Sequence, residues 1–229
     1  MFNQIDLEKR NAALAATEFI HNGMTIGLGS GTTVYWMIEI LGNLIKNGLE
    51  ITGVPTSRKT EEWARKFAIP LISLAKVDEI HLTIDGANEV DGNLNLIKGG
   101  GGSLVREKIV GHFSHENIII INQAKIHPEL GSFPLPVEVV PFGWELTSKY
   151  IQRLGGRVVL RKKHHQIFVT DNGNYILDCQ FGSLKNPGAL HHELKLLPGV
   201  VETGLFVDLT DKLIIGKNDS VEIMENIIK

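Results

Sequence analysis

Apolar and polar residues alternate at two different spacings in the first part of the chain. Residues 6–22 carry apolar side chains at helical spacing, and Gly23 follows as the expected C-terminal stop. Residues 25–28 form a short strand candidate that runs into a glycine-rich turn, and residues 34–45 return to helical spacing. The predicted order is therefore helix, strand, glycine-rich turn and helix.

The same alternation continues to about residue 121. It predicts strands at residues 51–54, 70–74, 80–84 and 117–121, and helices at residues 59–67 and 103–113. Strands that alternate with helices are typical of a parallel sheet whose two faces are covered. We therefore expect an α/β fold with a Rossmann-like, mostly parallel sheet and helices on both faces.

The pattern changes after about residue 131, where a proline-rich connector precedes a denser set of strands. Strands are predicted at residues 137–140, 156–161, 166–170, 175–179, 200–207 and 213–216, and helices at 144–154 and 187–196. Residues 171–174, Asp-Asn-Gly-Asn, are typical of a hairpin turn. We expect a smaller inserted α+β domain of ferredoxin-like type at residues 131–203. Residues 1–130 and 204–229 would form the Rossmann-like catalytic domain, to which the last strand returns.

Composition and charge exclude several classes of protein. Of the 229 residues, 43% are hydrophobic and 21% are charged, which is ordinary for a globular protein. The net charge of −3 argues against a dedicated nucleic-acid binder, because phosphate backbones require a basic surface. The single cysteine, Cys179, excludes an intrachain disulfide and a multi-cysteine metal site. A secretory signal and a long apolar run are both lacking, so we expect a soluble, cytoplasmic protein without a membrane partner.

The glycine-rich turn at residues 27–33 lies between a predicted strand and a predicted helix. Such a turn aims backbone N–H groups and a helix N-terminus at one point, which suits a phosphate, and Ser30, Thr32 and Thr33 add hydroxyl groups. A dinucleotide fingerprint would need glycine in place of Thr32, and a Walker loop would need Gly-Lys-Ser/Thr. The turn favours a phosphate over NAD or ATP, with a structural turn capped by Ser30 or Thr32 as the alternative.

The segment from 85 to 108 carries the candidate chemistry. Asp85 ends an apolar strand, and ligands of open α/β sheets bind beyond the carboxyl ends of the strands. Four consecutive glycines at 99–102 are costly in backbone entropy, which suggests a backbone wrapped around a small ligand. Lys98 enters this loop and Glu107 lies in the helix after it, a combination that suits an enolate or enediolate intermediate.

Structural alternatives exist for these residues. Asp85 could be a turn residue before Gly86, and Glu107 could interact with the helix dipole. A capping box is excluded for Glu107, because it would place the glutamate at position 106, which is arginine. The basic cluster at 161–163 is interpreted as a solvated strand end.

The chain resembles ribose-5-phosphate isomerase of type A in blocks that run nearly from end to end. The matching blocks are residues 27–33, 85–108, 133–139, 170–174, 176–178, 197–201 and 204–206. Among these blocks, residues 98–108 are highly specific for the family. The resemblance implies an isomerase without cofactor or metal that interconverts D-ribose 5-phosphate and D-ribulose 5-phosphate in the non-oxidative pentose phosphate pathway. It also implies a phosphosugar as the ligand and a homodimer or homotetramer.

The resemblance also implies roles for individual residues. Glu107 would be the base that moves the proton between C2 and C1, while Asp85 and Lys98 would assist ring opening and stabilise the enediolate. The substrate-binding residues would be Ser30, Gly31, Thr32, Thr33, Asp85, Gly86, Ala87, Asn88, Lys98, Gly99, Gly100, Gly101 and Lys125. Lys9 is a looser match to a phosphate contact.

One position departs from the family pattern. The family usually reads Asp-Gly-Ala-Asp-Glu where this chain has Asn88 as the fourth residue. Asparagine hydrogen-bonds a hydroxyl group but neither takes a proton nor carries charge. We therefore expect ring opening to depend on Asp85 alone, with Asn88 still able to orient the substrate.

Two other functions remain open from the residues themselves. An amino-sugar-phosphate deaminase of related architecture could share the glycine turn, although the block at 98–108 fits it poorly. A sugar-phosphate sensor domain is the non-enzymatic alternative. The pairs His164-His165 and His191-His192 lack a matching carboxylate or cysteine framework, so we interpret them as surface residues rather than metal ligands.

Overall fold

The computed structural model describes residues 3–226 and divides by its contacts into two units. The first unit comprises Met1–Ala87, Arg106–Lys125 and Leu209–Lys229, and the second comprises Asn88–Val105 and Ile126–Asp208. The chain therefore passes from one unit to the other four times.

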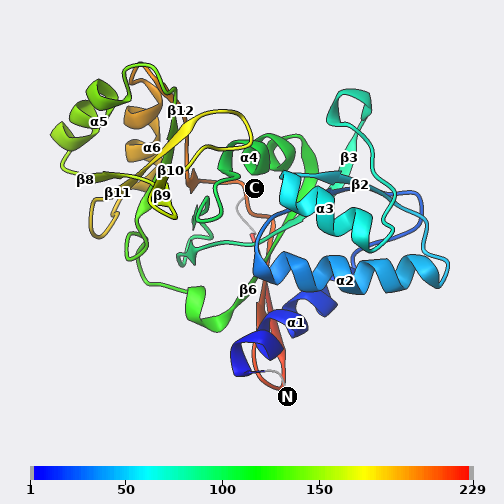
Figure 1. The fold of residues 1–229 in the computed structure, drawn as a ribbon. Helices are drawn as coiled ribbons and strands as arrows, with labels where there is room; N and C mark the ends of the chain where they lie inside the picture. Colours follow the sequence, from blue (N-terminus) through cyan, green and yellow to red (C-terminus); the bar gives the residue numbers. More distant parts are fainter. Residues whose placement is uncertain (1–2, 227–229) are drawn as a thin grey trace. The chain divides into compact units, whose positions relative to one another are not determined.

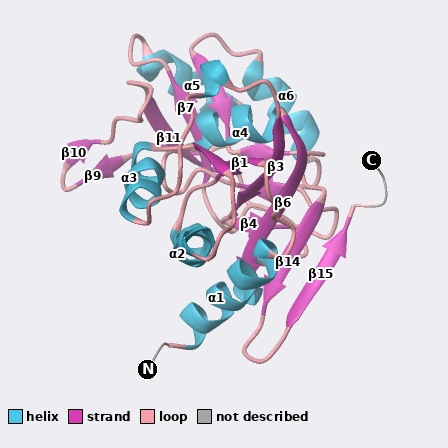
Figure 2. Cartoon of the chain, turned by 90° about the vertical axis from the view of Figure 1, so that its right-hand side faces the viewer, coloured by secondary structure: helices cyan, strands magenta, loops and turns pink. Residues whose placement is uncertain are grey.

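The first unit is built on a six-stranded sheet with the order β15-β14-β6-β3-β1-β2. Five strands are parallel, namely β1 (Thr25–Leu28), β2 (Thr52–Pro55), β3 (Ile80–Asp85), β6 (Ser114–Asn122) and β14 (Lys212–Gly216). The edge strand β15 (Val221–Glu225) pairs antiparallel with β14, and Figure 2 shows the two as a long hairpin.

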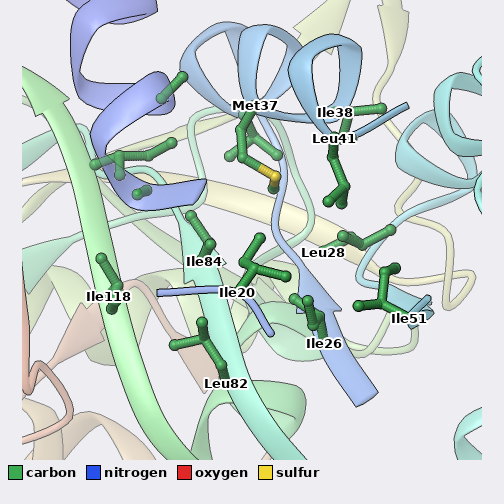
Figure 3. Close-up of a cluster of buried hydrophobic side chains, with 14 of the residues drawn as sticks. Ile20, Ile26, Leu28, Met37, Ile38, Leu41, Ile51, Leu82, Ile84 and Ile118 are labelled. Atoms are coloured by element: carbon green, nitrogen blue, oxygen red, sulfur yellow. The ribbon is translucent and has the colours of Figure 1, made fainter. Parts of the chain in front are cut away.

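Helices cover both faces of this sheet. On one face lie α1 (Gln4–Thr17) and α2 (Thr32–Lys46), with α3 (Arg58–Lys66) packed beside α2 (Figure 1). Figure 3 shows Met37, Ile38 and Leu41 of α2 above the isoleucine and leucine side chains of the strands. On the other face, α4 (Leu104–His112) lies so close that a Cβ on Gly27 would press on its Val110 side chain. The expected Rossmann-like sheet is confirmed.

The second unit contains a four-stranded antiparallel sheet with the order β12-β7-β11-β8. Its elements follow the chain order β7 (Leu135–Val139), α5 (Trp144–Arg153), β8 (Arg157–Leu160), β11 (Tyr175–Gln180), α6 (Pro187–Lys195) and β12 (Val200–Thr203). This order and strand arrangement are those of a ferredoxin-like fold, as expected. A core that includes Val137, Ile151, Leu177 and Leu194 joins the two helices to one face of the sheet.

Two small sheets complete the second unit. In the first, β5 (Leu96–Ile97) pairs with β4 (Glu89–Val90) and with β13 (Leu205–Phe206), and in the second, β9 (Lys162–Lys163) pairs with β10 (Gln166–Ile167). The division by contacts thus differs from the expected boundaries at 131 and 203. The segment Asn88–Val105 joins the second unit because its strands pair with β13 there.

Several predicted strands differ in the structure. Residues 70–74 make one isolated bridge, between Leu71 and Gly53, and end in the 3-10 turn η1 (Leu74–Lys76), because Pro70 offers no N–H to a ladder. The predicted strand at 200–207 is split at Gly204 into β12 and β13. The hairpin at 171–174 keeps its turn, in which Thr170 N–H donates to the Asn174 carbonyl, but only one bridge follows, between Val169 and Tyr175.

Candidate active site

The carboxyl ends of the parallel strands in the first unit carry several of the predicted site residues. The Ser30 loop (residues 29–33) follows β1, Asp85 ends β3, and Lys125 ends the 3-10 turn η2 (Gln123–Lys125) after β6. Parallel neighbours place these ends at one edge of the sheet.

Asp85 is tied directly to the Ser30 loop. Its carboxylate Oδ1 accepts the backbone N–H of Ser30 at 2.9 Å and that of Gly86 at 2.7 Å, and the residue is 2% exposed. A Cβ on Gly29 would overlap with this carboxylate, so the close approach requires glycine at position 29. The alternative interpretation of Asp85 as a turn residue explains the bond to Gly86 but not the bond to Ser30.

A cluster of hydroxyl groups surrounds the Ser30 side chain. Ser30 Oγ lies 3.0 Å from Thr56 Oγ1, 3.0 Å from Ser57 Oγ and 3.1 Å from Thr60 Oγ1. Thr60 also donates to the Gly29 carbonyl at 2.8 Å. Sequence reasoning missed Thr56, Ser57 and Thr60, although hydroxyl residues directly after a second parallel strand were a usable sign.

The N-terminus of α2 has the features of an anion site. Its N-cap is Gly31, with φ of +108°, and no side chain makes a cap hydrogen bond there. The alternative in which Ser30 or Thr32 caps the helix is therefore wrong. Thr32 at the first position of the helix is exposed and Thr33 is half-buried. Uncapped N–H groups and the positive end of the helix dipole favour a phosphate at this position.

Glu107 lies near the same edge of the sheet. It belongs to the first turn of α4 and is 5% exposed. The other end of α4 is fixed at the start of β6, where the Ser114 hydroxyl donates to the Val110 carbonyl and lies 2.6 Å from the Thr83 hydroxyl of β3. Since α4 precedes β6 and returns along it, its first turns point toward the carboxyl ends of the strands.

The remaining predicted residues belong to the second unit. Asn88 Oδ1 accepts the backbone N–H of Gly100 at 2.9 Å, which ties Asn88 to the four-glycine loop (residues 99–102). Lys98 is 3% exposed, its N–H donates to the Gly204 carbonyl, and its Nζ lies 5.3 Å from the centre of the Phe206 ring. A buried lysine of this kind can stabilise negative charge on a bound oxygen.

Other polar residues of this region organise loops. Glu89 is buried and accepts the backbone N–H of Gly131 at 2.7 Å, and Asp91 accepts the N–H groups of Asn93 and Asn95 at 2.9 Å. Lys9 forms an ion pair with Asp6 at 3.7 Å, and its contact with phosphate stays a prediction.

The two predicted histidine pairs are mostly exposed. His164, His165 and His192 are exposed, and His191 Nδ1 lies 2.7 Å from the Thr203 hydroxyl. Within residues 3–226, no group of three or more histidine, cysteine or acidic side chains could hold a metal ion. The same residues include no helix that is both long enough and apolar enough to cross a membrane.

Comparison with known protein families shows to which family the chain belongs. A family model described as ribose 5-phosphate isomerase A (phosphoriboisomerase A) matches residues 52–220. The chain belongs to the ribose 5-phosphate isomerase A family. Members of this family are isomerases, which confirms the expected enzyme class, and neither a deaminase nor a sensor is favoured.

Individual relatives match over nearly the whole chain. The ribose-5-phosphate isomerase A of Bacillus mycoides is 51% identical over 215 residues, which cover 93% of this chain and 97% of that protein. A D-ribose-5-phosphate isomerase solved in complex with phospho-erythronic acid superposes with a TM-score of 0.94 at 37% identity, covering 98% of this chain and 100% of the other. The ribose 5-phosphate isomerase of Plasmodium falciparum gives a TM-score of 0.91 at 40% identity, covering 96% and 97%.

Proposed function

We propose that this chain interconverts D-ribose 5-phosphate and D-ribulose 5-phosphate through a 1,2-enediolate, with Glu107 as the base. The observation that carries the proposal is the buried Glu107 carboxylate in the helix that follows the four-glycine loop. A buried carboxylate beside the substrate can take a carbon-bound proton when a neighbouring group stabilises the enediolate that forms.

The proposed reaction begins with opening of the furanose ring, assisted by Asp85. Glu107 then removes the proton from C2, and electron density moves onto the C1 oxygen to give the enediolate. Lys98 and backbone N–H groups of the four-glycine loop stabilise the negative charge. A proton then moves from O2 to O1, which places the negative charge on O2, and Glu107 delivers its proton to C1 as the C2 carbonyl forms, which yields the ketose.

The phosphate would bind at the Ser30 loop. The uncapped N-terminus of α2 and the hydroxyl groups of Ser30, Thr32 and Thr33 suit a phosphate, and Lys125 adds a positive charge at the same edge of the sheet. Gly86 and Ala87 would line the sugar beside Asp85. Binding energy from the remote phosphate would orient the reacting carbons.

The reaction can be tested by following ribose 5-phosphate in D₂O with NMR, using protein treated with EDTA. A proton-transfer mechanism predicts ribulose 5-phosphate with deuterium from solvent incorporated at C1. Deuterium at C1 would exclude a hydride shift, whereas ketose formed with the original hydrogen fully retained would contradict exchange of the Glu107 proton with solvent during turnover. Absence of isomerisation would contradict the proposed substrate. A place in the non-oxidative pentose phosphate pathway, a cytoplasmic location and a homodimer or homotetramer remain predictions.

A further inference from the structure

The four-glycine loop needs support from outside its own sequence. Gly99 and Gly102 have φ of +96° and +88°, and the loop makes one internal turn in which Gly102 N–H donates to the Gly99 carbonyl at 3.0 Å. Glycines have the largest backbone freedom, so a chain of four populates many conformations unless other groups fix its peptides. A catalytic role for the loop therefore requires side chains that hold it.

Arg161 and Asn88 fix successive peptides of this loop. The Arg161 Nη1 donates to the carbonyl of Gly99 at 2.8 Å and to that of Gly100 at 3.1 Å. Asn88 Oδ1 holds the Gly100 N–H from the other side. The guanidinium is itself held by Asp178, through Nε to Oδ2 at 2.9 Å and through Nη2 to Oδ1.

The Arg161–Asp178 pair lies on the face of the four-stranded sheet opposite to helices α5 and α6. Leu160 and Leu177, the neighbours of these residues, pack on the helix side, so alternation along the strands sends Arg161 and Asp178 to the opposite face. The Arg161 side chain is 12% exposed, so the interpretation of residue 161 as a solvated strand end is wrong. Phe168 supports the same loop, because its ring occupies the place of a Cβ on Gly102.

Together with the planarity of the peptide, these hydrogen bonds set the direction of the Gly101 N–H. The N–H of Gly100 is already used by Asn88. The Gly100 carbonyl accepts from Arg161, and in a planar trans peptide the N–H of Gly101 points away from that carbonyl. Gly101 is exposed, and the space where its Cβ would stand is open. A cationic donor on the carbonyl also polarises the peptide and makes this N–H a stronger donor.

We propose that Arg161, held by Asp178, is a positioning residue that aims the Gly101 N–H at the oxyanion of the intermediate. The inference rests on the proposed isomerase function. Arg161 does not touch the substrate in this account and acts only through the loop. Removing it should therefore weaken stabilisation of the intermediate more than it weakens binding of the phosphate group.

The test compares Arg161→Met, Arg161→Lys and Asp178→Asn with Lys163→Met, an exposed residue of the same basic cluster. The measurements are kcat and KM for ribose 5-phosphate, the inhibition constant of phospho-erythronic acid, and the dissociation constant of inorganic phosphate. Phospho-erythronic acid carries a carboxylate that can stand in for the charged enediolate. Near-ultraviolet circular dichroism monitors folding of each variant.

Arg161→Met should lower kcat by at least about tenfold, equivalent to about 1.4 kcal/mol of barrier. The inhibition constant of phospho-erythronic acid should rise by a similar factor, while phosphate binding changes less than about twofold. Arg161→Lys should recover part of kcat, since lysine restores the positive charge but not the planar guanidinium with its several donors. The double variant Arg161→Met/Asp178→Asn should be no worse than Arg161→Met alone, and Lys163→Met should resemble the wild type.

Retention of wild-type kcat by Arg161→Met would overturn the inference, as would an equal loss of phosphate and phospho-erythronic acid binding. If Arg161→Met does not fold, the same measurements on Asp178→Asn test the inference, because asparagine keeps the side-chain shape but holds the guanidinium less firmly. A wild-type kcat in Asp178→Asn would then overturn the inference. A wild type that fails to isomerise ribose 5-phosphate would refute the proposed function instead. In that case, equal binding of phospho-erythronic acid by wild type and variant would separately refute the role of Arg161.

Discussion

The carboxylate of Asp85 accepts the backbone N–H of Ser30 at 2.9 Å, which joins the end of β3 to the loop after β1. The same oxygen accepts the N–H of Gly86, so two backbone donors fix its position. The proposed ring-opening residue and the proposed phosphate loop are therefore held as one structure. A change that disturbs either residue should affect both phosphate binding and turnover.

Gly29→Ala tests this coupling. An added Cβ would overlap with the Asp85 carboxylate and displace it or the Ser30 loop. We expect kcat/KM to fall by at least about tenfold and stability to fall by about 1–3 kcal/mol, typical of overpacking. Steady-state kinetics and denaturant unfolding measure the two effects. The control is Gly92→Ala, where no atom lies within 4 Å of the new Cβ. Wild-type kinetics in Gly29→Ala would show that the close approach is unimportant.

Thr60→Val tests the hydroxyl cluster under the Ser30 loop. Thr60 is fully buried and donates to the Gly29 carbonyl, so valine leaves that carbonyl without this donor. We expect a loss of about 1–3 kcal/mol in the free energy of unfolding and a higher KM for ribose 5-phosphate. Thr52→Val, in the half-buried first position of β2, serves as the matched control. An unchanged KM in a destabilised Thr60→Val would limit the cluster to a structural role.

Substitutions of Asn88 separate its contact with the four-glycine loop from the effect of lacking the carboxylate that is usual in the family. Asn88→Ala removes the acceptor of the Gly100 N–H and should lower kcat, since the four-glycine loop loses one of its supports. Asn88→Asp keeps an acceptor and should fold like the wild type. If asparagine is a handicap for ring opening, Asn88→Asp will raise turnover on the furanose form about tenfold. Pre-steady-state assays with ribose 5-phosphate at ring-opening equilibrium measure this, and equal turnover would make the exchange neutral.

Cys179 should be chemically inert in the folded protein. Burial raises the pKa of its thiol far above the usual range, and the neighbouring Asp178 carboxylate raises the pKa further. The thiol therefore stays protonated at pH 7–9, whereas only the thiolate reacts with disulfide reagents. Ellman's reagent at pH 8 should label no thiol in the native protein and one in guanidinium chloride. Rapid labelling of the native wild type, absent in Cys179→Ala, would contradict the burial.

The parallel sheet and the ferredoxin-like order were predictable because each long element carries its own periodicity. Helix α2 and strand β1 are examples, with apolar residues at the spacing that their faces require. The strands β4 and β5 were not predictable, because two residues are too few to show a period, and β13 was predicted only as the end of a longer strand at 200–207. The pairing of β5 with β13 is one of the contacts that place Asn88–Val105 in the second unit, together with the bonds of Arg161 to Gly99 and of Gly131 to Glu89.

The residues of the candidate site likewise include some that the sequence predicts and some that it does not. Asp85, the four-glycine loop and Glu107 stand out in the sequence because their types are unusual at those positions. Arg161 does not, since a basic residue beside two lysines looks like any solvated strand end. Its contact with Asp178 depends on the register of β8 and β11, which pairs Val159 with Asp178 and leaves Arg161 diagonal to it. Register of this kind is a property of the folded sheet.

The turnover of ribose 5-phosphate by Glu107→Gln tests whether Glu107 is the base. Glutamine keeps the shape of the side chain but takes no proton, so we expect kcat to fall by about 10²- to 10⁴-fold while the dissociation constant of inorganic phosphate stays within about twofold. Glu62→Gln, on the exposed side of α3, should retain wild-type turnover. A folded Glu107→Gln with a kcat near that of the wild type would remove Glu107 from the role of base and contradict the mechanism.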